Sequence, residues 1–251
     1  MKQLERAFTF LSPLLLLLFW EGLVRGGALD ARFFPAPSSV LKVMAELALS
    51  GALWEHIRAS LLRVGSGFLL GAVPGAVVGI AMGLNRWVRA VLNPVVAAIY
   101  PIPKSAILPL MMLIFGLGET SKIMLVAISV FFVVLINAMA GVLQIDPIYL
   151  DVGRNLRVSR FQFFRTIALP GALPVIMAGV KLGMGTSLIV IVMAEMVASQ
   201  SGIGYLLWQS WQTLVVEEMY VGLIVISALG LVSTWVLDGL ERVLIPWKRA
   251  R

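Results

Sequence analysis

The segment Val152–Pro174, VGRNLRVSRFQFFRTIALPGALP, separates two strongly apolar stretches of a 251-residue chain. It carries four arginines and three phenylalanines, whereas the flanking stretches Ile123–Leu143 and Leu173–Ala198 contain only two charged residues between them. Stretches of about 20 apolar residues are long enough to cross a bilayer as helices. The sequence therefore predicts a basic connection between two membrane spans. We refer to residues 151–170 as the basic segment.

The composition of the whole chain is that of an integral membrane protein. Hydrophobic residues make up 60% of the sequence and charged residues 13%, and the mean hydropathy is +0.96. These charges are too few to cover the surface of a soluble fold of this length. The net charge is +7, but most of the cations lie in short connections, where they act as topology signals. We therefore expect no binding of nucleic acid.

Six stretches reach the length of a membrane-spanning helix, and their even number places both termini on one side. Lysine and arginine gather at the two termini and in the second and fourth connections, so that side is predicted to be the cytoplasm. The first stretch follows two cations, as in a signal peptide, but no small-residue cleavage site follows it, and we expect it to be retained. The six predicted spans are Phe8–Val24, Leu61–Leu84, Val91–Phe115, Ile123–Leu143, Leu173–Ala198 and Met219–Leu240.

Three local patterns predict how these spans are shaped. Glycine recurs at every fourth position from Gly67 to Gly83, which lets another helix approach closely along that face. Pro101, Pro103 and Pro109 interrupt the third span, and broken helices at membrane depth usually line a cavity. Before the second span, a helix beginning near Pro37 would place four apolar residues on one face at the membrane surface, namely Val40, Leu41, Met44 and Leu47.

The chain lacks the residues that most catalytic or nucleotide sites require. It has no cysteine and one histidine, His56, so it can form neither a disulfide nor a thiolate metal site, and a single histidine makes no metal cluster. No G-x-x-x-x-G-K-[ST] motif occurs, so the chain has no P-loop of its own. We expect a protein that is not an enzyme and that carries no cofactor or metal.

Ionisable residues inside predicted spans are costly and are candidates for function. Lys104 lies in the proline-broken third span: it either lines a pathway that favours anions or polar groups, or hydrogen-bonds carbonyls that the prolines leave free. Glu195 lies near the outer end of the fifth span, where a hydrated or capped carboxylate costs little, and functional and structural roles are equally open. Lys181, nearer the cytoplasmic end of that span, is expected to extend its ammonium to the interface.

The basic segment combines cations with aromatic residues, and two interpretations fit this pattern. Arg154, Arg157 and Arg160 are three residues apart and would spread along one side of a helix, while the phenylalanines are of the kind enriched at protein interfaces. The segment would then bind a partner protein. Alternatively, it rests on anionic lipid headgroups as an amphipathic segment.

The residues DVGRNLRVSRFQFFRTIALP, Asp151–Pro170, resemble the cytoplasmic E-A-A-x-x-x-G-x9-I-x-L-P signature of ATP-binding-cassette (ABC) importer permeases. Asp151, Val152 and Gly153 fall on E-A-A, and Ile167, Leu169 and Pro170 fall on I-x-L-P with the same spacing. Asp replaces Glu, and Arg157 stands where the signature has Gly. Further stretches resemble the branch that transports nitrate, sulfonate, taurine and bicarbonate: PIPKSAILPLMMLIFGLGETSK, VFFVVLINAMAGV, LPGALPVIMAGVKLG, VMAEM and SGIGYL.

This resemblance implies an all-α, type I importer permease of the bacterial inner membrane, acting as a homodimer. Two ATPase subunits, which hold ATP and magnesium, would bind the basic segment. An extracytoplasmic solute-binding protein would deliver a small solute, either a small anion such as a sulfonate or oxyanion or a small organic nutrient. An ion-coupled secondary transporter or channel is the alternative, and it would need intramembrane carboxylates, for which Glu195 is the candidate. The implied ATPase-coupling residues are Asp151, Val152, Gly153, Arg154, Arg157, Ser159, Arg160, Phe161, Phe164, Ile167, Leu169 and Pro170.

The expected domain organisation has three parts. Residues 1–55 contain the N-terminal span and the extracytoplasmic interfacial helix. Residues 56–240 form the permease core, and residues 241–251 form a basic cytoplasmic tail.

Overall fold

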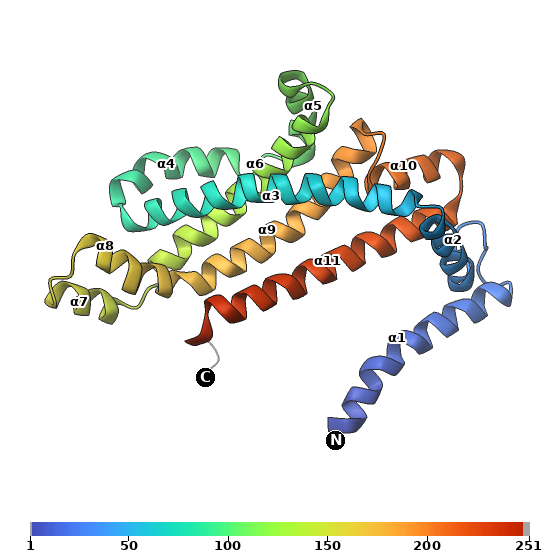
Figure 1. The fold of residues 1–251 in the computed structure, drawn as a ribbon, viewed down its shortest axis with the longest axis horizontal. Helices are drawn as coiled ribbons and strands as arrows, with labels where there is room; N and C mark the ends of the chain where they lie inside the picture. The colour runs from blue at the N-terminus through green and yellow to red at the C-terminus, as the bar shows by residue number, and fades with distance from the viewer. Residues whose placement is uncertain (1, 248–251) are drawn as a thin grey trace.

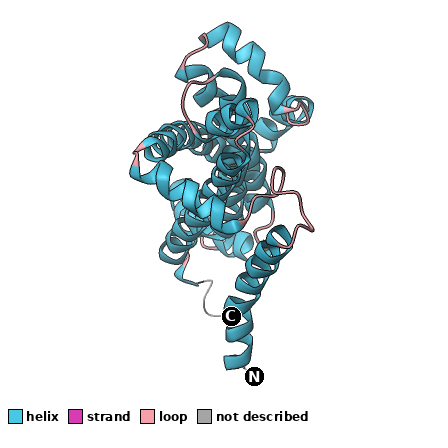
Figure 2. Cartoon of the chain, turned by 90° about the vertical axis from the view of Figure 1, so that its right-hand side faces the viewer, coloured by secondary structure: helices cyan, strands magenta, loops and turns pink. Residues whose placement is uncertain are grey.

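The computed structural model describes residues Lys2–Trp247, with the side chains from Leu11 onward except that of Arg154. Over these residues the protein consists of helices and loops without a strand (Figure 2). The tail cations Lys248, Arg249 and Arg251 lie outside the described residues.

Four long helices form the centre of the molecule and run side by side (Figure 1). They are α3 (Ala52–Leu84), α6 (Glu119–Leu143), α9 (Leu169–Ala198) and α11 (Val216–Leu244). Each is long and apolar enough to cross a membrane, α9 together with the helical turns that precede it from Arg160. They correspond to the second, fourth, fifth and sixth predicted spans. Because α3 begins at Ala52, the expected division between residues 55 and 56 falls within its first turn.

The third predicted span is broken rather than straight. Helices α4 (Arg86–Ile99) and α5 (Lys104–Phe115) meet at an angle of 98° across the sequence Tyr100–Pro103. Neither Pro101 nor Pro103 has a backbone N–H to donate, and a proline disfavours helical geometry in the residue before it. The described part of the chain holds four candidate spans, or five if α4 and α5 are counted together as one broken span.

Helix α1 (Lys2–Arg25) covers the first predicted span, but it leaves the bundle over most of its length (Figure 1). It is attached at its C-terminal end, where Glu21 accepts hydrogen bonds from Ser38 N and Oγ at 3.0 and 2.6 Å. There the ring of Trp20 also lies 5.5 Å from the ring of Tyr220. The leucines between residues 14 and 18 are all exposed, so an apolar face of α1 is left for lipid or for another chain.

The glycine spacing in α3 has the predicted consequence. A Cβ on Gly71 would lie 2.3 Å from the Ala127 carbonyl oxygen, and one on Gly79 would lie 2.3 Å from that of Leu135. Such distances are impossible for a real side chain, so these two positions require glycine for α3 to pack directly on the α6 backbone. This contact holds the centre of the bundle, around Phe68, Val126, Val130 and Ile191.

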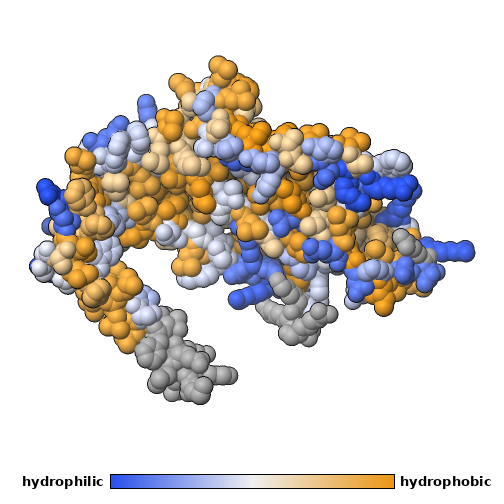
Figure 3. Space-filling model, turned by 180° about the vertical axis from the view of Figure 1, so that it is seen from behind, coloured by the Kyte–Doolittle hydropathy of each residue, from blue (hydrophilic) through white to orange (hydrophobic). Residues whose placement is uncertain are grey.

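Short helices close the two ends of the bundle. At one end lie α2 (Pro37–Leu49) and α10 (Ile203–Thr213). Helix α2 forms where the sequence predicted it and packs on α10 and α11 through Val40, Val43 and Met44, while Leu41 stays 55% exposed. At the other end lie α7 (Pro147–Asn155) and α8 (Arg160–Phe163), followed by a π-helical turn, Phe164–Ala168, that runs into α9. Hydrophilic side chains gather at this second end, whereas apolar side chains cover most of the bundle (Figure 3).

Candidate functional site

The basic segment folds as two short helices joined by a tight turn. Helix α7 ends with a hydrogen bond from Val158 N to the Gly153 carbonyl at 3.2 Å, and Arg157 adopts a left-handed conformation with φ of 49°. This 6→1 bond around a left-handed residue is the Schellman motif, whose left-handed position is usually occupied by glycine. Arg157 stands where the signature has Gly, so the structure retains the turn that the glycine would favour.

The turn passes directly into a capped second helix. Ser159 has an extended conformation, and its Oγ accepts a hydrogen bond from Gln162 N at 3.2 Å. A serine at this position satisfies one of the free N–H groups at a helix N-terminus. The positions of α7 and α8 relative to one another therefore follow from Arg157 and Ser159, which lie between them.

Close packing fixes the basic segment to the bundle. Gly153 is buried, and a Cβ there would lie 2.9 Å from Ile167 Cδ1 and 3.1 Å from the Phe163 ring. Phe163, Phe164 and Ile167 are themselves half-buried against an apolar cluster at the end of the bundle that carries the basic segment. The buried members of that cluster are Ala138, Val142, Ile145, Ala168, Ala172 and Ile176.

The aromatic residues of the segment therefore divide into two groups. Phe161 is 72% exposed and Leu156 is 71% exposed, whereas Phe164 packs inward. Phe164, which the resemblance implied as a coupling residue, is half-buried, and its ring packs against the apolar cluster of the bundle. Asp151, Val152, Arg157, Ser159 and Arg160 are also exposed, and Leu169 and Pro170 are half-buried at the start of α9. The side chain of Arg154 lies outside the described residues.

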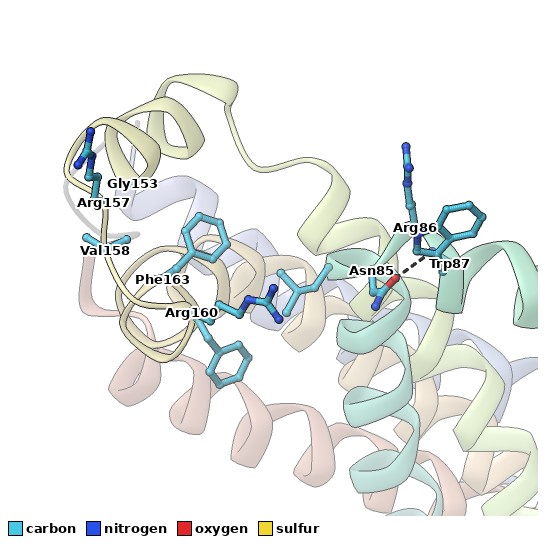
Figure 4. A pocket seen from close by; sticks show the side chains of 10 residues that line it. Asn85, Arg86, Trp87, Gly153, Arg157, Val158, Arg160 and Phe163 are labelled. Carbon is cyan, nitrogen blue, oxygen red and sulfur yellow. Dashed lines mark hydrogen bonds between the residues drawn. The ribbon is translucent and has the colours of Figure 1, made fainter.

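A cavity of about 760 Å³ separates the basic segment from the turn between α3 and α4. Arg160 extends from α8 into this space, and Arg86 and Trp87 stand on its opposite side (Figure 4). The guanidinium of Arg86 lies 4.9 Å from the centre of the Trp87 ring, which is 69% exposed. Asn85 caps α4 by accepting a hydrogen bond from Trp87 N at 2.9 Å. The two connections thus form one basic and aromatic surface with a hollow in it.

Lys104 is the first residue of α5, immediately after the break in the third span. Its Nζ donates to the carbonyl oxygens of Tyr100 and Ile102 at 3.0 and 3.1 Å, and it lies 5.3 Å from the centre of the Phe132 ring. These hydrogen bonds are the ones expected if Lys104 has a structural role, in which its ammonium binds carbonyl oxygens that the proline break leaves without a helical partner. The side chain remains partly exposed, so the same ammonium also faces the surroundings of the bundle.

Glu195 is completely buried, so of the two expected states, hydrated or capped, the structure shows the capped one. It accepts hydrogen bonds from Arg63 Nη1 at 2.7 Å, from Ser60 Oγ at 2.8 Å and from Gly204 N at 3.0 Å. A buried carboxylate is tolerated when it is paired with a cation and its oxygens are hydrogen-bonded. Gly202 is also required here, because its φ is +111° and a Cβ would lie 2.3 Å from the Glu195 carboxyl carbon.

The Arg63–Glu195 pair is part of a larger network that the sequence did not predict. Arg63 also donates to Glu119, at the start of α6, and to the Ser201 carbonyl oxygen at 2.6 Å. Lys122 donates to Glu119 at 2.9 Å. We call this group the outer cluster, and it joins the ends of α3, α6 and α9 opposite the basic segment. Its members are Ser60, Arg63, Glu119, Lys122, Glu195, Ser199 and Ser201.

Lys181 has neighbours other than those expected. Its ammonium pairs with the carboxylates of Asp238 and Glu241 on α11, so it joins α9 to α11 instead of extending alone toward an interface. The sequence signal that could have indicated this pairing is the spacing of Asp238 and Glu241, three residues apart on one helix face.

Comparison with known proteins gives a family match over most of the bundle. The family model described as binding-protein-dependent transport system inner membrane component matches residues 75–250. The taurine transport system permease protein TauC of Escherichia coli (strain K12) is 34% identical over 237 residues, which cover 92% of this chain and 86% of that protein. The putative aliphatic sulfonates transport permease protein SsuC of Bacillus subtilis (strain 168) is 32% identical, with 96% of this chain and 87% of that protein covered.

A solved structure has the same fold. A chain of the MetNI methionine ABC transporter in an inward-facing conformation superposes with a TM-score of 0.64. The match covers 76% of this chain and 97% of that chain, at 17% sequence identity. The helical arrangement described above is therefore that of a type I importer permease.

Proposed function

Because this chain belongs to the binding-protein-dependent transport system inner membrane component family, we propose that it forms the pathway of an ABC importer for a small anionic solute. As a transport permease of this family the chain is not an enzyme, and ATP hydrolysis belongs to a separate subunit. The named relatives transport taurine and aliphatic sulfonates, which share a sulfonate head group. A small sulfonate or a similar oxyanion is accordingly the proposed class of solute.

We propose that the basic segment is the site at which the ATPase subunit binds. The observation that carries this proposal is the exposure of Leu156 and Phe161, which flank the left-handed turn at Arg157. Large apolar side chains at the tip of a charged connection are costly in water, and aromatic side chains such as that of Phe161 are enriched at the cores of protein interfaces. The segment continues through the π-helical turn into α9 without a break, so a force applied to it would reach the bundle directly.

The lipid-resting alternative is less well supported by this geometry. A segment adsorbed on headgroups needs an extended amphipathic face, whereas α7 has nine residues, α8 has four, and a tight turn divides them. The cavity beside Arg160 would also give a protruding partner side chain a place to bury. We therefore favour a protein partner over lipid.

The pathway itself is proposed to form between two copies of this chain, with a solute-binding protein delivering solute at the outer-cluster end. Lys104 is proposed to face this pathway. Its ammonium stands at the N-terminus of α5, where the helix dipole also favours negative charge, as at the broken helices of other transporters. Its bonds to the Tyr100 and Ile102 carbonyls would hold the cation in place without neutralising it.

An ion-coupled secondary transporter or channel is not favoured. Glu195, the carboxylate on which that interpretation depended, is neutralised by Arg63 and enclosed by Ser60 and Gly204. A proton- or ion-coupling carboxylate must exchange its ligand during the cycle, and this one would have to break a buried ion pair to do so.

The proposed location is the bacterial inner membrane with both termini in the cytoplasm, which places the basic segment inside and α2 outside. Because the native chain has no cysteine, single cysteines report orientation cleanly. We expect Ser39→Cys, on α2, to react with a membrane-impermeant maleimide applied to intact cells, and Ser159→Cys to react only after the membrane is opened. Labelling of position 159 in intact cells would reverse the proposed orientation.

The experiment that tests the proposed function is copurification followed by reconstitution. The affinity-tagged permease should retain an ATPase through detergent extraction, and the complex in proteoliposomes should take up taurine or methanesulfonate only with ATP and a binding protein present. Uptake driven by an ion gradient without ATP would favour the secondary transporter. Release of the ATPase at every salt concentration would argue against the permease assignment.

A further inference from the structure

A cavity of about 530 Å³ opens at the outer cluster, between the ends of α5, α6 and α9. Part of its wall carries charge and hydroxyl groups, and the rest is apolar. The charged and polar residues on the wall include Arg63, Glu119, Lys122, Ser199 and Ser201, and the apolar residues include Met112, Leu117 and Val197. A wall of this kind matches a small molecule with an anionic head and a short alkyl tail.

The carboxylate of Glu119 occupies the charged part of this wall. It is held by both sides of the Arg63 fork, through Nε to one oxygen and Nη2 to the other at 2.9 Å. Lys122 Nζ donates to the second oxygen, also at 2.9 Å. A bidentate guanidinium together with an ammonium is the arrangement by which proteins bind carboxylate, sulfonate and phosphate ligands. Glu119 therefore stands where such a ligand would bind.

The three charged side chains differ sharply in exposure. The side chains of Arg63 and Lys122 are 4% and 3% exposed, whereas that of Glu119 is 58% exposed. The cations are thus built into the helix ends, while the carboxylate reaches them from the open side of the cavity. Glu119 is therefore the member that can move into water when another anion takes its place, and the buried cations cannot.

The charge balance of the outer cluster shows which charge would remain unpaired if the Glu119 carboxylate moved away. Glu195 neutralises Arg63 from the closed side. Lys122 has Glu119 as its carboxylate partner and otherwise donates to the Ala198 carbonyl oxygen and Ser199 Oγ at 3.3 and 3.2 Å. Without Glu119 the site would hold one uncompensated, buried positive charge, which is strongly unfavourable unless an anion replaces the carboxylate.

We propose that the outer cluster is a binding site for a small sulfonate-type anion, and that the Glu119 carboxylate occupies it as a built-in competitor. The incoming head group would accept the hydrogen bonds of Arg63 and Lys122, and its alkyl tail would lie against Met112 and Leu117. This inference rests on the proposed function for the class of anion. It adds a site at the outer end of the bundle, separate from Lys104.

The test measures anion binding to the purified permease alone, with methanesulfonate as the probe and chloride at equal ionic strength as the reference. Binding is followed by the rise in the unfolding midpoint with methanesulfonate concentration. Glu119→Gln removes the competing charge and is expected to lower the half-saturating concentration at least tenfold relative to the parent. Lys122→Gln in the Glu119→Gln background is expected to abolish the response. Glu46→Gln removes an exposed carboxylate on α2 that is 62% exposed, so it is the matched control and should behave like the parent.

Equal responses of Glu119→Gln and Glu46→Gln would overturn the proposal, and so would a response to chloride as large as that to methanesulfonate. If Glu119→Gln folds only when methanesulfonate is present during purification, the site is supported. If it folds in neither methanesulfonate nor chloride, the proposal is overturned. The proposed function is judged separately. A permease that retains its ATPase but binds no methanesulfonate loses only this site, and one that binds the anion without an ATPase loses only the transport assignment.

Discussion

Truncation of Phe161 separates an interface role of the basic segment from a structural one. Its side chain is 72% exposed, so a little over a quarter of its surface is covered within the chain. Full burial of such a side chain contributes about 1.5 to 3 kcal/mol, and the covered part therefore contributes about 0.4 to 0.8 kcal/mol. Phe161→Ala should lower the free energy of unfolding of the permease by no more than this.

The same substitution should have a much larger effect on the ATPase. An aromatic anchor at the centre of an interface contributes about 1 to 4 kcal/mol when it is truncated, which corresponds to a roughly fivefold to several-hundredfold weaker complex. The matched control is Phe163→Ala, because Phe163 is two residues away but packs against Gly153 and the inner apolar cluster. It should lower the unfolding midpoint of the isolated permease more than Phe161→Ala does.

The assay titrates labelled ATPase onto nanodisc-embedded permease and records thermal unfolding of the same preparations. We expect Phe161→Ala to lose ATPase affinity with an almost unchanged midpoint. ATPase affinity equal to that of the parent would refute the interface role of Phe161. A midpoint loss as large as that of Phe163→Ala would refute the division of the two rings into exposed and packed.

Three further substitutions test other parts of the structure. Arg63→Met should cost about 3 to 5 kcal/mol of stability, because it leaves Glu195 buried without its cation. Adding Glu195→Gln should restore most of the lost thermal stability, and no restoration would mean that the unpaired Glu195 does not cause the loss. Gly71→Ala should destabilise the bundle by more than about 1 kcal/mol, because its Cβ would lie 2.3 Å from the Ala127 carbonyl oxygen. Gly65→Ala on the same helix, where a Cβ meets nothing within 4 Å, should be neutral or stabilising by up to about 1 kcal/mol, and equal effects of the two substitutions would contradict the close helix contact. Lys104→Met should reduce anion uptake by the reconstituted complex while the ATPase is still retained, and unchanged uptake would leave Lys104 with only its structural role at the proline break.

The sequence was most informative where a single physical constraint dominates. The four-residue glycine spacing in α3 predicts a close helix contact, since only glycine allows the carbonyls of Ala127 and Leu135 to approach so closely. Pro101 and Pro103 predict the break between α4 and α5 for an equally local reason. The order of apolar stretches likewise predicts the four long helices, because each must be long enough to cross a bilayer.

Contacts between distant residues could not be obtained in the same way. Arg63 lies in the first third of the second predicted span and its partners Glu119 and Glu195 are 56 and 132 residues away, so nothing in the local pattern indicates the pairing. The sequence therefore left Glu195 open between a hydrated and a capped carboxylate and placed Lys181 at an interface, although both are paired with charged residues within the bundle. Phe161, Phe163 and Phe164 present the same problem, because these three similar residues differ only in the direction that the turn at Arg157 imposes on them.

The most direct test of the central claim is cross-linking from the tip of the basic segment. Phe161→Cys, in a chain without other cysteines, can carry a photoreactive maleimide in native membranes that contain the complete transporter. Leu113→Cys on α5, with its parent side chain 82% exposed, is the control at the opposite part of the bundle. The account predicts a light-dependent adduct of permease and ATPase from position 161 and none from position 113. Adducts with lipid alone from position 161, in membranes where the ATPase is present and active, would contradict it.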